Sequence, residues 1–328
     1  MDWTKFRNRL GGFRTTLYMI VIAFVASSIM TYIAGVPFSQ FYTTLVQQGL
    51  ESPSGLQTLV ALTTVFVLTG LAASIPFSAS TFNVGGEGQI YMGALAATTV
   101  IVALGTQSML AVVTSALVTG GVWGLIPAIL KFKFRTNEIV TTLLLNFIAT
   151  FIVIYAVRVP LRMPASITPQ SENLPQLFSS IPILLATIVG VVLVSYVLTE
   201  RTRLGYEIQV VGRNPRAAAY AGINIAYVGM ITMVIGGAIA GLAGAIIVTS
   251  SLMGTLILGL SSNYGYVGIG IALMARLRST EVPLSAFILA LLFVTVRFLS
   301  TAVSTVPLLL STAVVGIIMI CVAFVRRQ

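Results

Sequence analysis

The chain has 328 residues, of which 57% are hydrophobic and 8% are charged, and its formal net charge is +10 at pH 7. Soluble domains carry roughly 25% charged residues. This composition therefore excludes a soluble protein and predicts a chain that crosses a membrane many times. The chain has no histidine and one cysteine, Cys321, which excludes a disulfide framework and a thiolate metal site.

The positive charges occur in short clusters between apolar runs, as in the cytoplasmic loops of membrane proteins. This distribution argues against a nucleic-acid partner, which would need a basic groove with interleaved aromatic side chains. The lysines do not follow a glycine-rich phosphate loop, so we expect no ATP site in this chain. If both termini are cytoplasmic, nearly all lysines and arginines lie inside, and Arg158 and Arg162 lie outside.

In chain order, the apolar runs predict about ten membrane-spanning helices, or eight or nine if a segment is re-entrant. The first, Leu17 to Val36, is too long for the apolar core of a secretory signal peptide, and an outer loop is expected from Pro37 to Gly55. The fifth begins at Asn137, a good N-cap, with Glu138 in its first turn. The other predicted spans are Leu56 to Ile75, Ile90 to Leu104, Met109 to Leu130, Ile181 to Leu198, Ala226 to Ser250, Tyr264 to Ala275, Val282 to Thr301 and Pro307 to Val325.

Two polar loops and one irregular segment separate these spans. Prolines at 160, 164, 169 and 175 predict an extended outer loop over residues 158–180, and residues 200–225 form the longest cytoplasmic loop. Residues 251–263 have apolar runs too short to span, which predicts a broken or re-entrant element. In the span before them, Gly237 and Gly241 predict close helix packing. Residues 1–328 are expected to form a single transmembrane domain.

The stretch from residue 83 to residue 93 interrupts what would otherwise be apolar helix. Its glycines at 85, 86 and 88 each cost about 1 kcal/mol relative to alanine in a helix interior, which favours a break. A charged Glu87 at membrane depth costs about 2.5–3.5 kcal/mol, and irregular backbone there must be buried in protein or line a watery cavity. We therefore predict a translocation pathway, with the carboxylate held by the amides of the glycine turn or by Gln89. An ordinary surface loop with a solvated Glu87 is the alternative.

The cytoplasmic loop contains a predicted short helix with a cap at each end. Asn214 is a good N-cap, Pro215 suits the first helical position and Gly222 suits the stop. The alanines between them would form a flat face against which another protein could pack. A turn with only a structural role is the alternative.

Three stretches together resemble a known family. Residues 83–94, Asn-Val-Gly-Gly-Glu-Gly-Gln-Ile-Tyr-Met-Gly-Ala, resemble the Asn-Ile-Gly-x-Glu-Gly-Gln signature of ATP-binding-cassette (ABC) importer permeases for branched-chain amino acids, ribose-like sugars and nucleosides. Residues 136–142 and 212–218 are similar to the bacterial nucleoside-type branch. The resemblance runs from about residue 50 to the C-terminus. Gly86 departs from the signature, where another small residue, often Ala or Val, is expected; the glycine should loosen the turn without changing the assignment.

The resemblance implies an all-α polytopic fold like that of the vitamin B12 importer, with about ten spans and broken or re-entrant segments. It also implies a bacterial cell membrane location and three partners: a second homologous permease, a cytosolic ABC ATPase that uses Mg-ATP, and an extracytoplasmic substrate-binding lipoprotein. No cofactor is expected in this chain. The implied ATPase-coupling residues are Gly212, Arg213, Asn214, Pro215, Arg216, Ala217, Ala218, Ala221 and Gly222.

Several polar and aromatic residues could recognise a small-molecule substrate, because a nucleoside needs a stacking surface and a few hydrogen bonds. A simple sugar or a branched-chain amino acid could use the same groups. The candidates for the substrate pathway are Asn83, Glu87, Gln89, Tyr91, Asn146, Asn263 and Tyr264. For Asn146, a hydrogen bond between helices is the alternative to substrate contact.

Two other classes of protein remain open at this point. A proton-coupled secondary transporter could use Glu87 as its proton carrier with Arg297 as countercharge, but it would not need the capped cytoplasmic helix. A membrane-embedded enzyme is disfavoured, because no histidine, cysteine pair or carboxylate pair at catalytic spacing is present.

Overall fold

The computed structural model describes residues 35–164 and 166–302, together with 21, 24, 25, 27–29, 31–33 and 316. Regular structure in this part of the chain is helical, and a single β-bridge joins Gln170 to Ile257. The helices are α2 (Phe38–Thr44), the π-helix η1 (Leu45–Glu51), α3 (Pro53–Ser78), α4 (Gly86–Leu104), α5 (Met109–Phe134), α6 (Glu138–Arg158), α7 (Ile181–Arg201), α8 (Arg203–Arg213), α9 (Pro215–Tyr220), α10 (Ile225–Val248), α11 (Tyr264–Met274) and α12 (Val282–Ala302).

Seven of the described helices are long and apolar enough to cross a membrane: α3, α4, α5, α6, α7, α10 and α12. Each corresponds to a predicted span. The predicted span Tyr264 to Ala275 forms α11, which has 11 residues and is too short to cross by itself. The predicted spans Leu17 to Val36 and Pro307 to Val325 lie largely outside the described residues.

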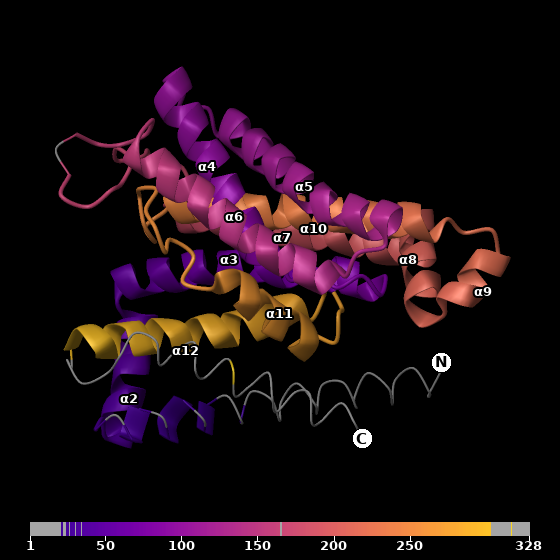
Figure 1. Cartoon of the computed structure of the whole chain (residues 1–328). Coiled ribbons are helices and arrows are strands. Elements are labelled where there is room, and N and C mark those ends of the chain that lie inside the picture. Colours follow the sequence, from indigo (N-terminus) through magenta and orange to yellow (C-terminus); the bar gives the residue numbers. More distant parts are fainter. Residues whose placement is uncertain are drawn as a thin grey trace.

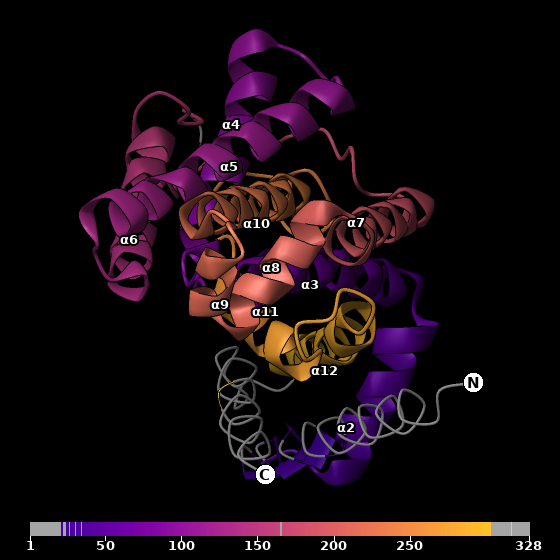
Figure 2. The ribbon, with the colours of Figure 1, turned by 90° about the vertical axis from the view of Figure 1, so that its right-hand side faces the viewer.

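Helices α3 and α10 lie at the centre of the bundle, as the view along the helices shows (Figure 2). Their most apolar windows are 89% and 78% buried, whereas that of α7 is 11% buried. A helix that is apolar on all sides and buried forms the core of a bundle, while one that exposes valine and leucine faces lipid. The core is therefore built on α3 and α10, and α5, α6 and α7 form an outer layer.

Glycines allow α10 to contact α4 and α5 at backbone distance. A Cβ added to Gly93 would overlap the carbonyl oxygen of Gly241, and one added to Gly120 would overlap that of Gly237. Gly237 and Gly241 are both buried. The close packing predicted from the spacing of these two residues is confirmed.

The outer loop expected from Pro37 to Gly55 is wrong, because these residues form α2, η1 and the start of α3. Phe41 and Leu45 are buried in the core, and Gly49 packs against the side chain of Leu291 on α12. Tertiary burial of one side thus stabilises helix in a segment whose other side exposes polar residues together with apolar ones such as Phe38 and Val46.

The two ends of the bundle differ (Figure 1). Helices α8 and α9 lie at one end, and the loop between α6 and α7 lies at the other. Helix α8, which the sequence interpretation treated as part of a polar loop, is amphipathic and buries Ile208 and Val211 on one side. Residues 249–263 contain no helix, as predicted for the segment between α10 and α11.

Candidate functional site

The predicted break in the glycine-rich stretch lies slightly earlier than expected. Helix α3 ends at Ser78, residues 79–85 form a corner, and α4 starts at Gly86, so Glu87 lies in the first turn of α4. The side chains of Asn83 and Gln89 exchange two amide hydrogen bonds of 3.2 Å, and Asn83 Oδ1 also accepts from Gly85 N at 3.0 Å. This pair fixes the entry of the corner into α4.

Glu87 is buried, with 7% of its surface exposed. Its hydrogen-bond partners lie far from it in the sequence. One carboxylate oxygen accepts a hydrogen bond from Ser261 Oγ, and the other accepts from the backbone N–H of Gly265 at 2.9 Å. The expectation that the glycine turn or Gln89 would hold this carboxylate is wrong. The alternative of a solvated Glu87 in a surface loop is also wrong.

Two helix N-termini therefore meet at Glu87, those of α4 and α11. The partial positive charge at a helix N-terminus favours a carboxylate, which helps to offset the cost of burying Glu87. The approach requires a glycine on α11, because a Cβ on Gly265 would overlap the backbone nitrogen of Glu87. The sequence reasoning missed Ser261 and Gly265; the serines that precede Asn263 in a weakly apolar segment were the available signal.

Asn146 of α6 is the second polar residue of this site. Its Oδ1 accepts from Gly88 N at 2.9 Å, and its Nδ2 lies 3.0 Å from both the Val84 carbonyl oxygen and the Tyr266 hydroxyl. The side chain joins α4, the corner, α6 and α11, so the interpretation as a hydrogen bond between helices is confirmed. Tyr266 was also missed.

The remaining predicted residues lie around the start of α11. Tyr264 is buried in edge-to-face contact with Phe66 on α3, at a centroid distance of 5.4 Å, so its ring is used in packing. Tyr91 is buried on α4 and interacts with Ser261. Asn263 is exposed in a left-handed conformation, with φ 68°. All seven predicted pathway residues therefore lie in or next to this junction of α4, α6 and α11.

The capped helix predicted in the cytoplasmic loop is confirmed as α9. Asn214 Oδ1 accepts from Ala217 N at 3.1 Å, and Gly222 has φ +77° just after the helix end. The flat alanine face is only partly correct. Ala218 is fully buried in a small cluster whose other members are Ala79, Ile208, Val211 and Val228.

The solvent-exposed side of α9 carries different residues from those expected. Arg216 and Tyr220 lie about 200° around the helix from the buried Ala218, and Tyr220 is 95% exposed. Ala217 and Ala221 are exposed as well. Ala218 faces the rest of the chain because α9 has only six residues and packs by this side onto α8.

Helices α8 and α9 are joined directly to the corner through the end of α8. Ser80 Oγ donates a hydrogen bond to the Gly212 carbonyl at 3.0 Å, and a Cβ on Gly212 would overlap the carbonyl oxygen of Ser78. The end of α8 therefore lies against the end of α3. The implied coupling residue Gly212 is thus in contact with the start of the segment that carries Glu87.

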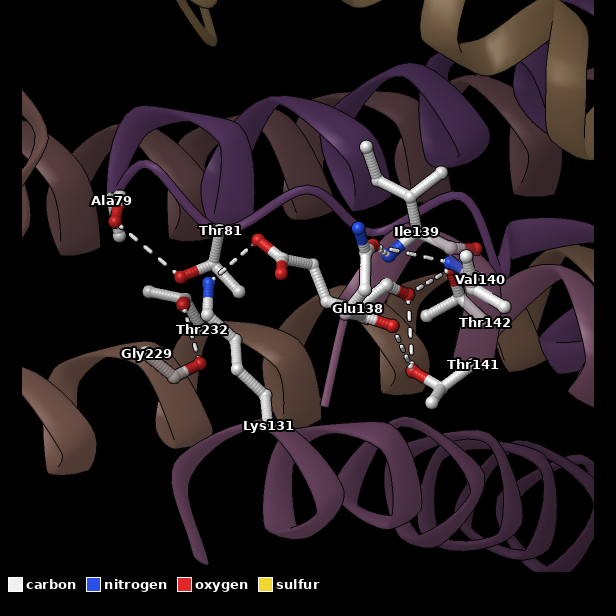
Figure 3. A network of polar contacts seen from close by, with 11 residues as sticks. Ala79, Thr81, Lys131, Glu138, Ile139, Val140, Thr141, Thr142, Gly229 and Thr232 are labelled. Carbon is white, nitrogen blue, oxygen red and sulfur yellow. Dashed lines mark hydrogen bonds and ion pairs between the residues drawn. The ribbon is translucent and has the colours of Figure 1, made fainter. Parts of the chain in front are cut away.

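The turn between α5 and α6 holds the same corner from another side. Lys131 Nζ lies 2.7 Å from Glu138 Oε1, and Figure 3 shows this ion pair. Glu138 also interacts with the backbone of Phe82. Asn137 caps α6 as predicted, with its Oδ1 2.9 Å from Ile139 N. The corner is thus fixed both by the end of α8 and by the turn between α5 and α6.

The described residues combine seven helices that are long and apolar enough to cross a membrane with a non-helical segment, a short helix and a buried carboxylate at their junction. These are the features of a multi-span membrane transport protein. The chain belongs to the family of permease components of branched-chain amino acid transport systems, whose pattern it matches over residues 55–323. It is therefore a transport subunit of the ABC type and is not itself an enzyme.

Three relatives illustrate the range of this family. The chain is 34% identical to the glucose ABC transporter permease protein of Haloferax volcanii, over 77% of this chain and 72% of the relative. It is 28% identical to the guanosine ABC transporter permease protein of Bacillus subtilis, over 86% and 84%. It is 25% identical to the nucleoside ABC transporter permease protein of Lactococcus lactis subsp. cremoris, over 84% and 80%.

Proposed function

We propose that this permease forms, with a second homologous permease, the membrane pathway of an ATP-driven importer for nucleosides. The relatives named for guanosine and nucleosides align over 84% or more of this chain, and residues 136–142 and 212–218 resemble the nucleoside-type branch. The relative of highest identity among the three is named for glucose. A simple sugar is therefore the second candidate, and a branched-chain amino acid is the third.

The proposed pathway rests on the exposed start of α11 at membrane depth. Helix α10 has 24 residues and is about 36 Å long, enough to cross the bilayer. Helix α11 is about 16 Å long. With its end, next to Arg276 and Arg278, at the cytoplasmic surface, α11 would start near the middle of the bilayer. Asn263 is exposed there, and non-helical backbone cannot face lipid. This surface would meet water or a partner subunit, which supports a pathway beside α11.

Arg297 of α12 supports the same location. Its side chain is exposed within a spanning helix, and none of the ion pairs in the described part of the chain includes it. An unpaired arginine at membrane depth faces a watery cavity or a partner. The geometry does not favour the secondary-transporter alternative, because the partners of Glu87 are Ser261 and Gly265 and not Arg297.

The other subunits follow from the ABC importer assignment. The solvent-exposed face of α9, with Arg216 and Tyr220, would meet a cytosolic ATPase that binds Mg-ATP. An extracytoplasmic lipoprotein would deliver the substrate. Both termini would be cytoplasmic, in a bacterial cell membrane. The complete fold would have about ten spans, as in the vitamin B12 importer.

Substrate uptake into right-side-out vesicles that contain the complete complex tests this proposal. Tritiated guanosine, glucose and leucine are offered separately, with and without ATP inside right-side-out vesicles. We expect guanosine uptake that requires ATP and persists after the proton gradient is collapsed. Uptake that needs the gradient and not ATP would establish the secondary transporter, and uptake of glucose or leucine instead would reassign the substrate.

A variant on α9 tests the ATPase contact within the same experiment. Tyr220→Glu places a charge on the exposed face and leaves the buried Ala218 side intact. We expect normal membrane insertion, reduced co-purification of the ATPase and loss of ATP-dependent uptake, whereas Tyr220→Phe retains them. Ala218→Glu is unsuitable, because it would disrupt packing within the chain itself. Full activity of Tyr220→Glu would remove α9 from the contact.

A further inference from the structure

The outer loop and the irregular segment after α10 are bonded to each other along their length. Ser171 N donates to the Leu256 carbonyl at 3.1 Å, and Leu256 N donates to Ser171 Oγ at 3.0 Å. Further backbone bonds run from Leu174 N to Gly254 O at 2.8 Å and from Phe178 N to Thr249 O at 2.9 Å. Gln170 and Ile257 form an antiparallel bridge between them.

Their apolar side chains share one packed layer. Leu174 and Phe178 of the outer loop are buried, as are Leu252, Leu256 and Leu260 of the other segment. In the proposed orientation α10 ends at the outer side of the bilayer, and residues 249–263 would lead from there through the outer half of the membrane to the start of α11. They cover the exposed start of α11 from the outside.

The end of the segment nearest to Glu87 is held by a side-chain hydrogen bond and not by backbone bonds to the outer loop. Ser261 is bonded to the Glu87 carboxylate, and the next two residues, Ser262 and Asn263, both have positive φ, at 44° and 68°. Consecutive left-handed non-glycine residues are strained and mark a point where backbone direction changes. Gly259, with φ +78°, lies just above and has open space around its Cα.

We propose that residues 166–178 and 249–261 form a single outer gate, and that the bond between Ser261 and Glu87 is the latch that keeps it closed. The inference rests on the proposed importer function and adds to it the element that must move. A substrate entering from outside has to displace residues 249–261 to reach Asn263. Moving the two segments together preserves all of their mutual backbone bonds and breaks the polar contact at Ser261.

Labelling from the outer side tests the latch without knowledge of the substrate. In the complete complex with Cys321→Ser, the probe residue is Asn263→Cys and the reagent is a membrane-impermeant methanethiosulfonate. We expect Ser261→Ala to raise the labelling rate of this cysteine at least threefold. Ser251→Ala is the matched control, because the Ser251 hydroxyl lies in the same segment and has no hydrogen-bond partner among the described residues. An unchanged rate in Ser261→Ala would overturn the latch.

A cross-link tests whether the two segments move together. In the same background, a disulfide between Gln170→Cys and Ile257→Cys joins bridged positions, whose Cα spacing of about 4.5–5.5 Å suits a disulfide. We expect the oxidised complex to keep the labelling rate and guanosine uptake of its reduced form. Loss of either on oxidation, restored by reductant, would show that the segments separate and would overturn the single gate.

The two proposals fail in different ways. If the chain were not part of an ATP-driven importer, ATP and vanadate would leave the labelling of Asn263→Cys unchanged in the otherwise unaltered complex, while the effect of Ser261→Ala would remain. If the gate is wrong and the importer is right, ATP alters labelling and Ser261→Ala does not.

Discussion

At the scale of single residues, the site is organised by side chains that bond to backbone groups across long sequence distances. Glu87 and Asn146 each satisfy a backbone N–H, that of Gly265 and that of Gly88. Both also bond a side chain on the segment around α11, Ser261 in one case and Tyr266 in the other. The contacts of Glu87 use its two acceptor oxygens, and the two helix N-termini that meet there favour its charge.

Substitutions of Glu87 separate shape from charge. Glu87→Gln keeps an acceptor for Gly265 N and a polar group for Ser261, so we expect the free energy of unfolding to fall by no more than about 1 kcal/mol. Glu87→Leu leaves two buried groups without partners, at about 1–3 kcal/mol each. Thermal unfolding and gel filtration of the complex in detergent measure the difference. A Glu87→Leu complex as stable as the unaltered one would contradict a structural role for the carboxylate.

The residues of this site were predictable, but most of their partners were not. A carboxylate among glycines in an apolar chain is visible in the sequence, and so is an asparagine within a span. The bond of Asn83 to Gln89 is local, whereas Ser261 lies 174 residues from Glu87. A contact between residues so far apart leaves no local pattern in a single sequence.

At the scale of elements, spans were predicted well because crossing a membrane depends on the length and polarity of one segment. Helices α2 and α8 were missed because their stability comes from one buried side. In α8 the signal was present: Leu204, Ile208 and Val211 recur at helical spacing between charged residues. Gly205 and Gly212 hid it, since both permit close contact with neighbouring backbone and weaken helix propensity.

The crossing of α10 with α5 offers a matched pair of glycine substitutions. A Cβ on Gly241 would overlap the Ala116 carbonyl oxygen, so we expect Gly241→Ala to destabilise the protein by about 1–3 kcal/mol through overpacking. Gly190→Ala in α7 meets no atom within 4 Å and should be neutral or stabilising by up to about 1 kcal/mol. Thermal unfolding in detergent compares them. Equal effects would mean that α10 and α5 separate readily at this crossing.

At the scale of the whole molecule, bonded contacts run from the cytoplasmic helices to the outer loop. Gly212 contacts the corner at Ser80, the corner leads into α4, and Glu87 of α4 bonds Ser261. The segment that holds Ser261 is in turn bonded to the outer loop at Ser171. Contiguity alone does not establish coupling between two sites. It does identify Gly212 as a place where this series of contacts can be interrupted while the exposed face of α9 and the bonds around Glu87 are left unaltered.

Gly212→Ala tests the contact between the end of α8 and the corner. The added methyl group would overlap the Ser78 carbonyl oxygen and move the end of α8 away from α3, while the solvent-exposed face of α9 stays unchanged. We expect the ATPase to remain bound and to hydrolyse ATP, with guanosine uptake reduced at least tenfold. Ser80→Ala, which removes only the exposed hydrogen bond to the Gly212 carbonyl, should give a smaller loss in the same direction. Simultaneous measurement of ATP hydrolysis and uptake in reconstituted vesicles distinguishes uncoupling from misassembly. Because α8 would be displaced and the site around Glu87 would keep its own bonds, a Gly212→Ala complex with unchanged uptake would mean that the cytoplasmic helices act on the pathway by another route.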